Sequence, residues 1–141
     1  MYATQQDLVL AKGEAQIIAL TDRDTPPAGV VDADVVTQAL GGASSTIDGY
    51  LRGRYAVPLQ TVPDEIRDAC IKIGFHTLHV NGVYPEGVQK DYDNTMRWLR
   101  EISTGVVVLS VDAAPAAAKD AEGAQYSGAD RIFTRDSMRG L

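Results

Sequence analysis

The sequence has few of the residues that mark secreted, zinc-stabilised or membrane-spanning proteins. Its 141 residues include a single cysteine, Cys70, which excludes an internal disulfide and a cysteine-rich zinc site. No apolar run approaches the ~20 residues that a membrane span requires, and the N-terminal residues lack the basic and apolar regions of a secretory signal. We therefore expect one soluble domain, made in a reducing compartment, with no membrane partner.

Positive charge is also scarce. Acidic residues number 19 against 13 lysines and arginines, for a formal net charge of -6, which argues against tight binding to a nucleic-acid backbone. The phosphate-binding patterns G-x-x-x-x-G-K-[ST] and G-x-G-x-x-G do not occur, and neither does the hydrolase pattern G-x-S-x-G. We predict a protein that is not an enzyme and that uses no cofactor.

Helical periodicity dominates the first hundred residues. Apolar residues at three- and four-residue steps, together with capping and stop signals, predict helices over residues 4–12, 14–20 (a short helical turn), 32 to at most 57, 62–80 and 85–104. Within the third of these, Gly41-Gly42 indicates either a bend or the close approach of another backbone. The β-branched run over 106–111 is too short for a confident helix and predicts a strand. The predicted fold is mainly α, a bundle of four to five helices with one short strand.

Composition changes near residue 112, where small residues, proline and glycine replace the apolar pattern. We therefore divide the chain into a helical body, residues 1–111, and an extended C-terminal arm, residues 112–141. The body carries 14 acidic and 9 basic residues, so most of the negative charge belongs to it. A lone strand needs a partner for its backbone groups, which is either the arm, around residues 131–134, or another subunit.

Three side chains of the fourth predicted helix are candidates for chemistry. His76 and His79 lie three residues apart and could share a metal ion or serve a small enzyme, but a metal site needs further ligands. Cys70 lies on the apolar face, where burial disfavours a reactive thiol. We predict structural roles for all three residues and no metal site.

The end of the long helix combines two tyrosines and two arginines within six residues. Such residues are typical of protein interfaces, and they can equally form a helix end whose tyrosines pack on the core and whose arginines are solvated. Asp48 and Arg52 have the spacing of an i, i+4 ion pair. The candidate interface residues of this segment are Asp48, Tyr50, Arg52, Arg54 and Tyr55.

Several short segments, in this order and spacing, carry a family resemblance. They are Met1-Tyr2-Ala3-Thr4 with Asp7-Leu8, Leu20-Thr21-Asp22-Arg23, Ile47-Asp48-Gly49-Tyr50-Leu51 with Arg54-Tyr55, Pro58-Leu59 with Val62-Pro63, and Gly105-Val106-Val107-Val108-Leu109. Together they resemble the small Mu-like prophage structural protein family, which is encoded among tailed-phage head and tail genes. The resemblance covers roughly residues 1–111 and does not include the arm.

This resemblance implies a helical fold like that of head–tail connector (adaptor) proteins. Such a protein forms a ring beneath the portal, usually of twelve copies, in the neck of the virion between head and tail. The implied partners are other copies of the chain, the portal protein, a tail-side neck protein, and DNA that passes through the lumen without specific binding. Synthesis is expected in the cytoplasm of the bacterial host, and no catalytic residue is implied.

Three other functions are compatible with parts of the pattern. A tail-completion or tail-terminator protein also forms a ring, expected to have six copies. A small helical DNA-binding regulator is disfavoured by the acidic balance. A small enzyme using His76 or His79 would need a pocket that joins a histidine to a perturbed carboxylate.

The arm has too little apolar surface to form a core alone, so we expect partners to hold it. The portal, an adjacent subunit and the next neck ring are the candidate partners; the alternative is an arm folded back on its own body. Its expected anchors are Tyr126, Ile132, Phe133 and Met138, with Arg131, Arg135 and Arg139 available for acidic partners.

Overall fold

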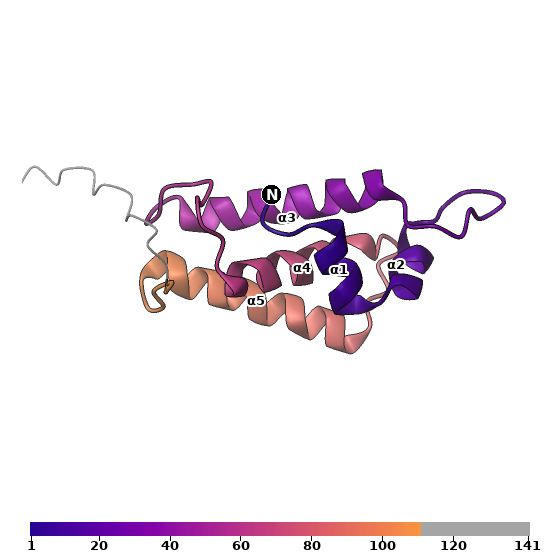
Figure 1. Ribbon diagram of the computed structural model, residues 1–141. Helices are drawn as coiled ribbons and strands as arrows, with labels where there is room; N and C mark the ends of the chain where they lie inside the picture. Colours follow the sequence, from indigo (N-terminus) through magenta and orange to yellow (C-terminus); the bar gives the residue numbers. More distant parts are fainter. Residues whose placement is uncertain (111–141) are drawn as a thin grey trace, which may run out of the picture.

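The computed structural model describes residues 1–110 as five helices. These are α1 (Gln5–Lys12), α2 (Glu14–Thr21), α3 (Ala33–Leu51), α4 (Asp64–Leu78) and α5 (Glu86–Thr104). The three long helices α3, α4 and α5 pack against one another, and α1 lies across α3 and α4 (Figure 1). The predicted mainly helical bundle is confirmed. None of the described helices is long and apolar enough to cross a membrane.

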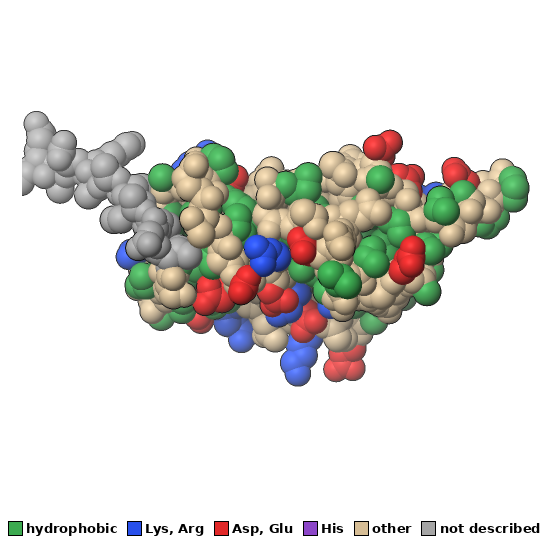
Figure 2. All heavy atoms as spheres, in the orientation of Figure 1, with side chains coloured by type: hydrophobic (Ala, Val, Ile, Leu, Met, Phe, Trp, Pro, Cys, Tyr) green, Lys and Arg blue, Asp and Glu red, His purple; other side chains and the backbone are tan. Residues whose placement is uncertain are grey.

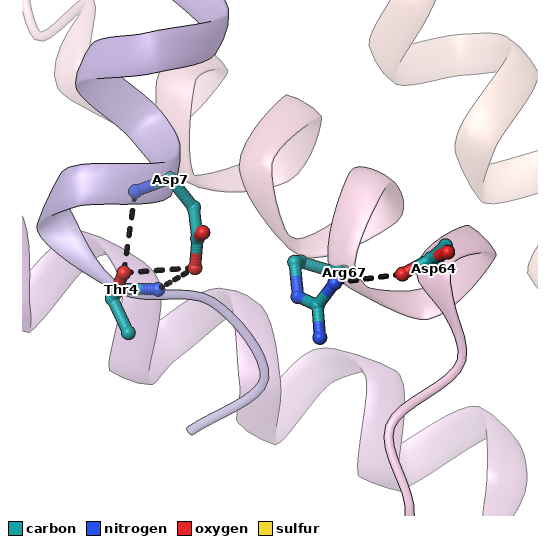
Figure 3. A network of polar contacts seen from close by, with 4 residues as sticks. All are labelled: Thr4, Asp7, Asp64 and Arg67. Carbon is teal, nitrogen blue, oxygen red and sulfur yellow. Dashed lines mark hydrogen bonds and ion pairs between the residues drawn. The ribbon is translucent and has the colours of Figure 1, made fainter.

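The starts of α1 and α3 are fixed by short polar side chains, as the sequence predicts. Thr4 accepts a hydrogen bond from the backbone N–H of Asp7, and the Asp7 carboxylate accepts from the Thr4 backbone, which completes a capping box (Figure 3). The hydrogen bond from the backbone N–H of Thr4 is the main cause of the lowered pKa of the Asp7 carboxyl. At α3, Asp32 accepts from the N–H groups of Asp34 and Val35.

The core lies where α3 crosses α4 and is closed by α5 and α1. Leu40, Ile47, Ile66, Leu99 and Ile102 are fully buried there. The helices α3 and α4 approach each other closely at Gly74, where an added Cβ would lie 2.8 Å from Cδ2 of Leu40. Gly41 and Gly42 do not have this role among residues 1–110, since α3 continues through them and a Cβ at either would meet none of these residues within 4 Å.

Two predictions differ from the structure: the end of one helix and the presence of a strand. The fourth predicted helix ends at Leu78, before Asn81-Gly82, because the chain turns at His79 and the Val80 N–H donates to the Leu78 carbonyl. The predicted strand over 106–111 is wrong for residues 106–110, which contain no strand. The rest of that prediction falls at residue 111, outside the described residues.

The physical reason for the missing strand is the way α5 ends. Gly105 has a left-handed φ of 82°, its N–H donates to Ile102, and the N–H of Val106 donates to Glu101, which is a Schellman end. The Val107 N–H also donates to Glu101. Backbone groups that a sheet would pair are therefore used to close the helix.

The arm, its proposed pairing with the strand and the boundary at residue 112 lie outside the described residues. The same holds for seven of the candidate interface residues, whose roles stay predictions: Tyr126, Arg131, Ile132, Phe133, Arg135, Met138 and Arg139.

Candidate interaction surfaces

Tyr55, one of the candidate interface residues, belongs to the core of the single chain. Its side chain is 6% exposed, and its hydroxyl accepts a hydrogen bond from the backbone N–H of Leu109 at 3.1 Å. Leu109 is itself buried. Tyr55 thus fixes the segment after α5 against the end of α3, which is the role that the core-packing interpretation predicts for it.

Asp48 is also engaged within the chain. Its carboxylate accepts a hydrogen bond from the Tyr2 hydroxyl, and the ion pairs among residues 1–110 do not include the predicted pair with Arg52. The Tyr2 hydroxyl accepts in turn from the backbone N–H of Leu59 at 3.0 Å, and the Tyr2 N–H donates to Ser44. One tyrosine therefore joins the N-terminus, α3 and the loop after it.

This environment raises the pKa of Tyr2 to about 12, chiefly because burial disfavours the phenolate and also because the Asp48 carboxylate accepts its proton in a hydrogen bond. In the sequence, Tyr2 is notable only as part of the family resemblance, and nothing near it predicts this junction. Its partners lie 46 and 57 residues away along the chain, so no local pattern could have revealed them.

Tyr50, Arg52 and Arg54 lie nearer the surface. Tyr50 is half-buried against the core, whereas both arginines are exposed. The Arg54 guanidinium lies against Gly105, where a Cβ would overlap it, so Arg54 covers the end of α5. The interface roles of all five residues in this segment stay predictions.

The two histidines are held by neighbouring protein groups. The His76 ring is stacked between Tyr84 and Tyr92, with ring centroids 4.2 and 4.0 Å away, and its Nε2 lies 3.1 Å from Oε1 of Gln89. The His79 Nδ1 lies 2.9 Å from the carbonyl oxygen of Phe75. These contacts tie α4 to α5 and to the loop between them. Within residues 1–110, no three His, Cys, Asp or Glu side chains converge as metal ligands.

Cys70 is buried, as its place on the apolar face predicts. Its Sγ lies 3.5 Å from Oγ of Ser44 on α3. Burial is the main cause that raises the pKa of the Cys70 thiol above its ordinary value, and this favours the unreactive protonated form.

A groove of about 330 Å³, which no sequence pattern predicts, lies between α4 and α5. Ala69, Thr95 and the half-buried ring of Trp98 line it, and Glu65 and Asp68 contribute negative charge. Its lining residues are Glu65, Asp68, Ala69, Lys72, Asn94, Thr95 and Trp98. Figure 2 shows acidic side chains gathered on the face over α4 and α5, with basic side chains among them. The groove thus presents one aromatic ring beside acidic groups.

Two groups of exposed apolar side chains lie at opposite ends of α5. Val80 and Val83, 61% and 77% exposed, precede the helix, whereas Val106 and Val108, 76% and 68% exposed, follow it. A helix of 19 residues is about 28 Å long at ~1.5 Å per residue. The two groups are therefore separate surfaces at the two ends of the bundle (Figure 1).

Comparison with known proteins gives matches over most of the chain. Residues 2–127 match the family model described as "Bacteriophage Mu, Gp36". The Mu-like prophage FluMu protein gp36 of Haemophilus influenzae is 33% identical over 116 residues, which cover 82% of each chain. Gene product J of Escherichia phage Mu is 32% identical over 136 residues, which cover 95% of this chain and 94% of the relative.

These matches correct one expectation. The resemblance was expected to stop near residue 111 and to leave out the arm, whereas the family match continues to residue 127. The small residues over 112–127 form no periodic pattern from which a resemblance could be noticed, yet they align with the family. The arm's first half therefore belongs to the region that the relatives share.

Proposed function

The chain belongs to the bacteriophage Mu Gp36 family, and on this premise we propose that it is a structural protein of the tailed-phage particle. Its proposed role is that of a head–tail connector: a ring below the portal, in the neck of the virion, that joins capsid to tail and lets DNA pass. Its proposed partners are other copies of itself, the portal protein and a tail-side neck protein. We also propose that the protein is not an enzyme.

The observation that carries this proposal is the pair of exposed apolar groups at the two ends of α5. A connector subunit must bind one partner on the head side and another on the tail side. Val80 and Val83 at one end, and Val106 and Val108 at the other, supply two separate surfaces about a helix length apart. Contiguous exposed apolar surfaces mark interaction sites, whereas single exposed apolar side chains are ordinary.

The charge of the body supports passage of DNA without binding. Residues 1–111 carry 14 acidic and 9 basic residues, and DNA binding depends on cations that neutralise phosphates. A ring lined by such subunits repels the duplex. A basic lining in the assembled ring, or salt-sensitive DNA binding by the purified chain, would contradict this part of the proposal.

Particle assembly without the protein tests the connector role. Cells that produce every phage protein except this chain should accumulate filled heads and separate tails, and adding the purified chain to that lysate should restore joined particles. A variant with Val80→Asp and Val83→Asp should fail to restore them, because charge at that end opposes an apolar contact. The matched control is Leu10→Asp, which changes an equally exposed apolar residue, 78% exposed, on α1.

Copy number separates the connector from a tail-completion or tail-terminator ring. Quantitative mass spectrometry of purified particles should give twelve copies of the chain for a connector and six for a ring on the tail side. If the chain is missing from purified particles, or joined particles form normally without it, both structural functions are wrong.

A further inference from the structure

The groove between α4 and α5 has the chemistry of a peptide-binding site. Trp98 exposes part of its ring there, beside Ala69 and Thr95. Lys72 is paired with Asp68 at 2.7 Å, whereas Glu65 takes part in no ion pair among the described residues. A segment that fits this groove would carry a large apolar side chain for Trp98 and a cation for Glu65.

The segment around Ile132-Phe133 has this composition. Between residues 112 and 141, adjacent large apolar residues occur only as Ile132-Phe133, and Arg131 and Arg135 flank them. Phe133 can pack on the ring of Trp98, and the arginines can pair with the acidic groove. Arginine and aromatic residues together are typical of the anchors that dominate binding at interfaces.

The position of residue 110 and the number of residues after it show that residues 131–135 can reach an α4–α5 groove. The Ser110 hydroxyl donates to Oε1 of Glu65 at 3.5 Å, so the last described residue lies at the rim of the groove of its own chain. Residues 111–130 then separate this point from Arg131. Twenty residues span at most ~70 Å when extended, more than twice the ~28 Å length of α3 or α5.

To reach the groove of the same chain, a segment would need only a few residues after Ser110, because Ser110 already contacts Glu65 at the rim of that groove. The long spacer instead suits a neighbouring copy. We propose that residues 131–135 of one copy bind the α4–α5 groove of the next copy. This inference rests on the proposed function, because the contact joins neighbouring copies in the proposed ring.

Each copy then carries one groove and one binding segment, so the contact is head-to-tail. Contacts of this kind join different surfaces of successive copies and close into a ring when the rotation permits. Phe133→Ala removes the apolar anchor, and Trp98→Ala removes its partner. Either variant alone should lose the contact.

A mixture of these two variants isolates the contact between copies, because Trp98 is the single tryptophan of the chain. The Trp98→Ala chain keeps an intact segment 131–135 and has no tryptophan, whereas the Phe133→Ala chain keeps an intact groove. Tryptophan emission from the mixture therefore reports only a groove occupied by the segment of the other chain. We expect the emission to shift to shorter wavelength, with saturation at a one-to-one ratio.

The mass of the mixed species gives a second readout. The Trp98→Ala chain cannot accept a segment and the Phe133→Ala chain cannot supply one, so the mixture should stop at a one-to-one dimer in sedimentation velocity. The matched control replaces the first chain with the double variant Trp98→Ala, Phe133→Ala, which should give neither a spectral shift nor a dimer. Higher salt should weaken the dimer, because charge pairs contribute to it.

Three results would overturn the inference. One is an unchanged emission in the mixture while circular dichroism shows both variants folded. Another is an intact chain whose emission equals that of Phe133→Ala at every concentration. The third is an intact chain whose emission differs from that of Phe133→Ala equally at all concentrations, which would assign the groove to the chain's own segment.

A synthetic peptide of residues 129–137, added to the Phe133→Ala chain, tests the groove even if Trp98→Ala does not fold. It should shift the Trp98 emission, whereas the same peptide with Arg131→Glu and Arg135→Glu should not. If the mixture shows docking but the chain is missing from particles, the proposed connector role fails and the contact between copies stands. If the chain occupies the neck but neither the mixture nor the peptide shifts the Trp98 emission, only this inference fails.

Discussion

The end of α3 and the α4–α5 groove both contain large aromatic side chains, but the chain uses them differently. At the end of α3, the hydroxyls of Tyr2 and Tyr55 bond to groups of the same chain and both rings are buried. In the groove, Trp98 is only half-buried and lies beside Glu65. The comparison teaches that a cluster of aromatic and charged residues in the sequence need not form an interface, since Tyr2, Asp48 and Tyr55 use their polar groups within the chain.

Truncation of one aromatic residue in each region gives the largest expected difference. Tyr55→Ala should lower the free energy of unfolding by about 3–5 kcal/mol, because it removes a buried ring and leaves the Leu109 N–H without its partner. Trp98→Ala should cost roughly half as much, since its ring is only half-buried. Urea unfolding followed by circular dichroism, at a concentration where the chain is monomeric, measures both. Equal losses would contradict the distinction between the regions.

Removal of a single hydroxyl tests the junction at Tyr2. Tyr2→Phe should lower the free energy of unfolding by about 1–3 kcal/mol, because the buried N–H of Leu59 loses its acceptor. Tyr84→Phe is the matched control: the Tyr84 ring stacks on His76 and is 37% exposed, so its loss should stay within ~0.5 kcal/mol. Thermal or urea unfolding of the two variants side by side decides the point, and similar losses would refute the role given to Tyr2.

The same junction should make stability depend on alkaline pH. The folded chain holds the Tyr2 proton with a pKa of about 12, whereas an unfolded tyrosine titrates near ~10. Between these values the folded state binds more protons than the unfolded state, so stability is complete below about pH 10 and falls as pH rises towards 12. Unfolding measured across this range should show a steeper loss for the native chain than for Tyr2→Phe. Parallel curves would contradict the junction.

The smallest effect is expected in the groove. Asp68→Asn breaks the i, i+4 pair with Lys72, whose side chains are 59% and 33% exposed. Exposed pairs of this kind contribute about 0.3–0.5 kcal/mol, so unfolding should barely change. A loss above ~1 kcal/mol would mean that the groove stabilises the chain itself, as the end of α3 does.

The helices could be predicted from sequence because their signals are local. Thr4 with Asp7, Asp32 and Gly105 each act within a few residues, and the structure places them at the helix ends that they predict. The segment over 106–110 could not be predicted from the β-branched composition of Val106 to Val108. The backbone N–H groups of Val106 and Val107 donate to the end of α5, and that of Leu109 donates to the hydroxyl of Tyr55.

The interaction surfaces were harder to predict for the same reason. Tyr55 and Asp48 form part of a conspicuous Tyr/Arg segment, yet their partners are Leu109 and Tyr2, 54 and 46 residues away. Trp98 lies outside the apolar stripe of α5 and becomes notable only when α4 is placed beside it. Long-range contacts of this kind leave no periodic trace in a single sequence.

A cryo-electron microscopy map of the neck of purified particles tests the central claim most directly. The account predicts a ring of this chain between head and tail, in which residues 131–135 of each copy fill the α4–α5 groove of the next. A neck without this chain, or a ring whose α4–α5 grooves stay open to solvent, would contradict it.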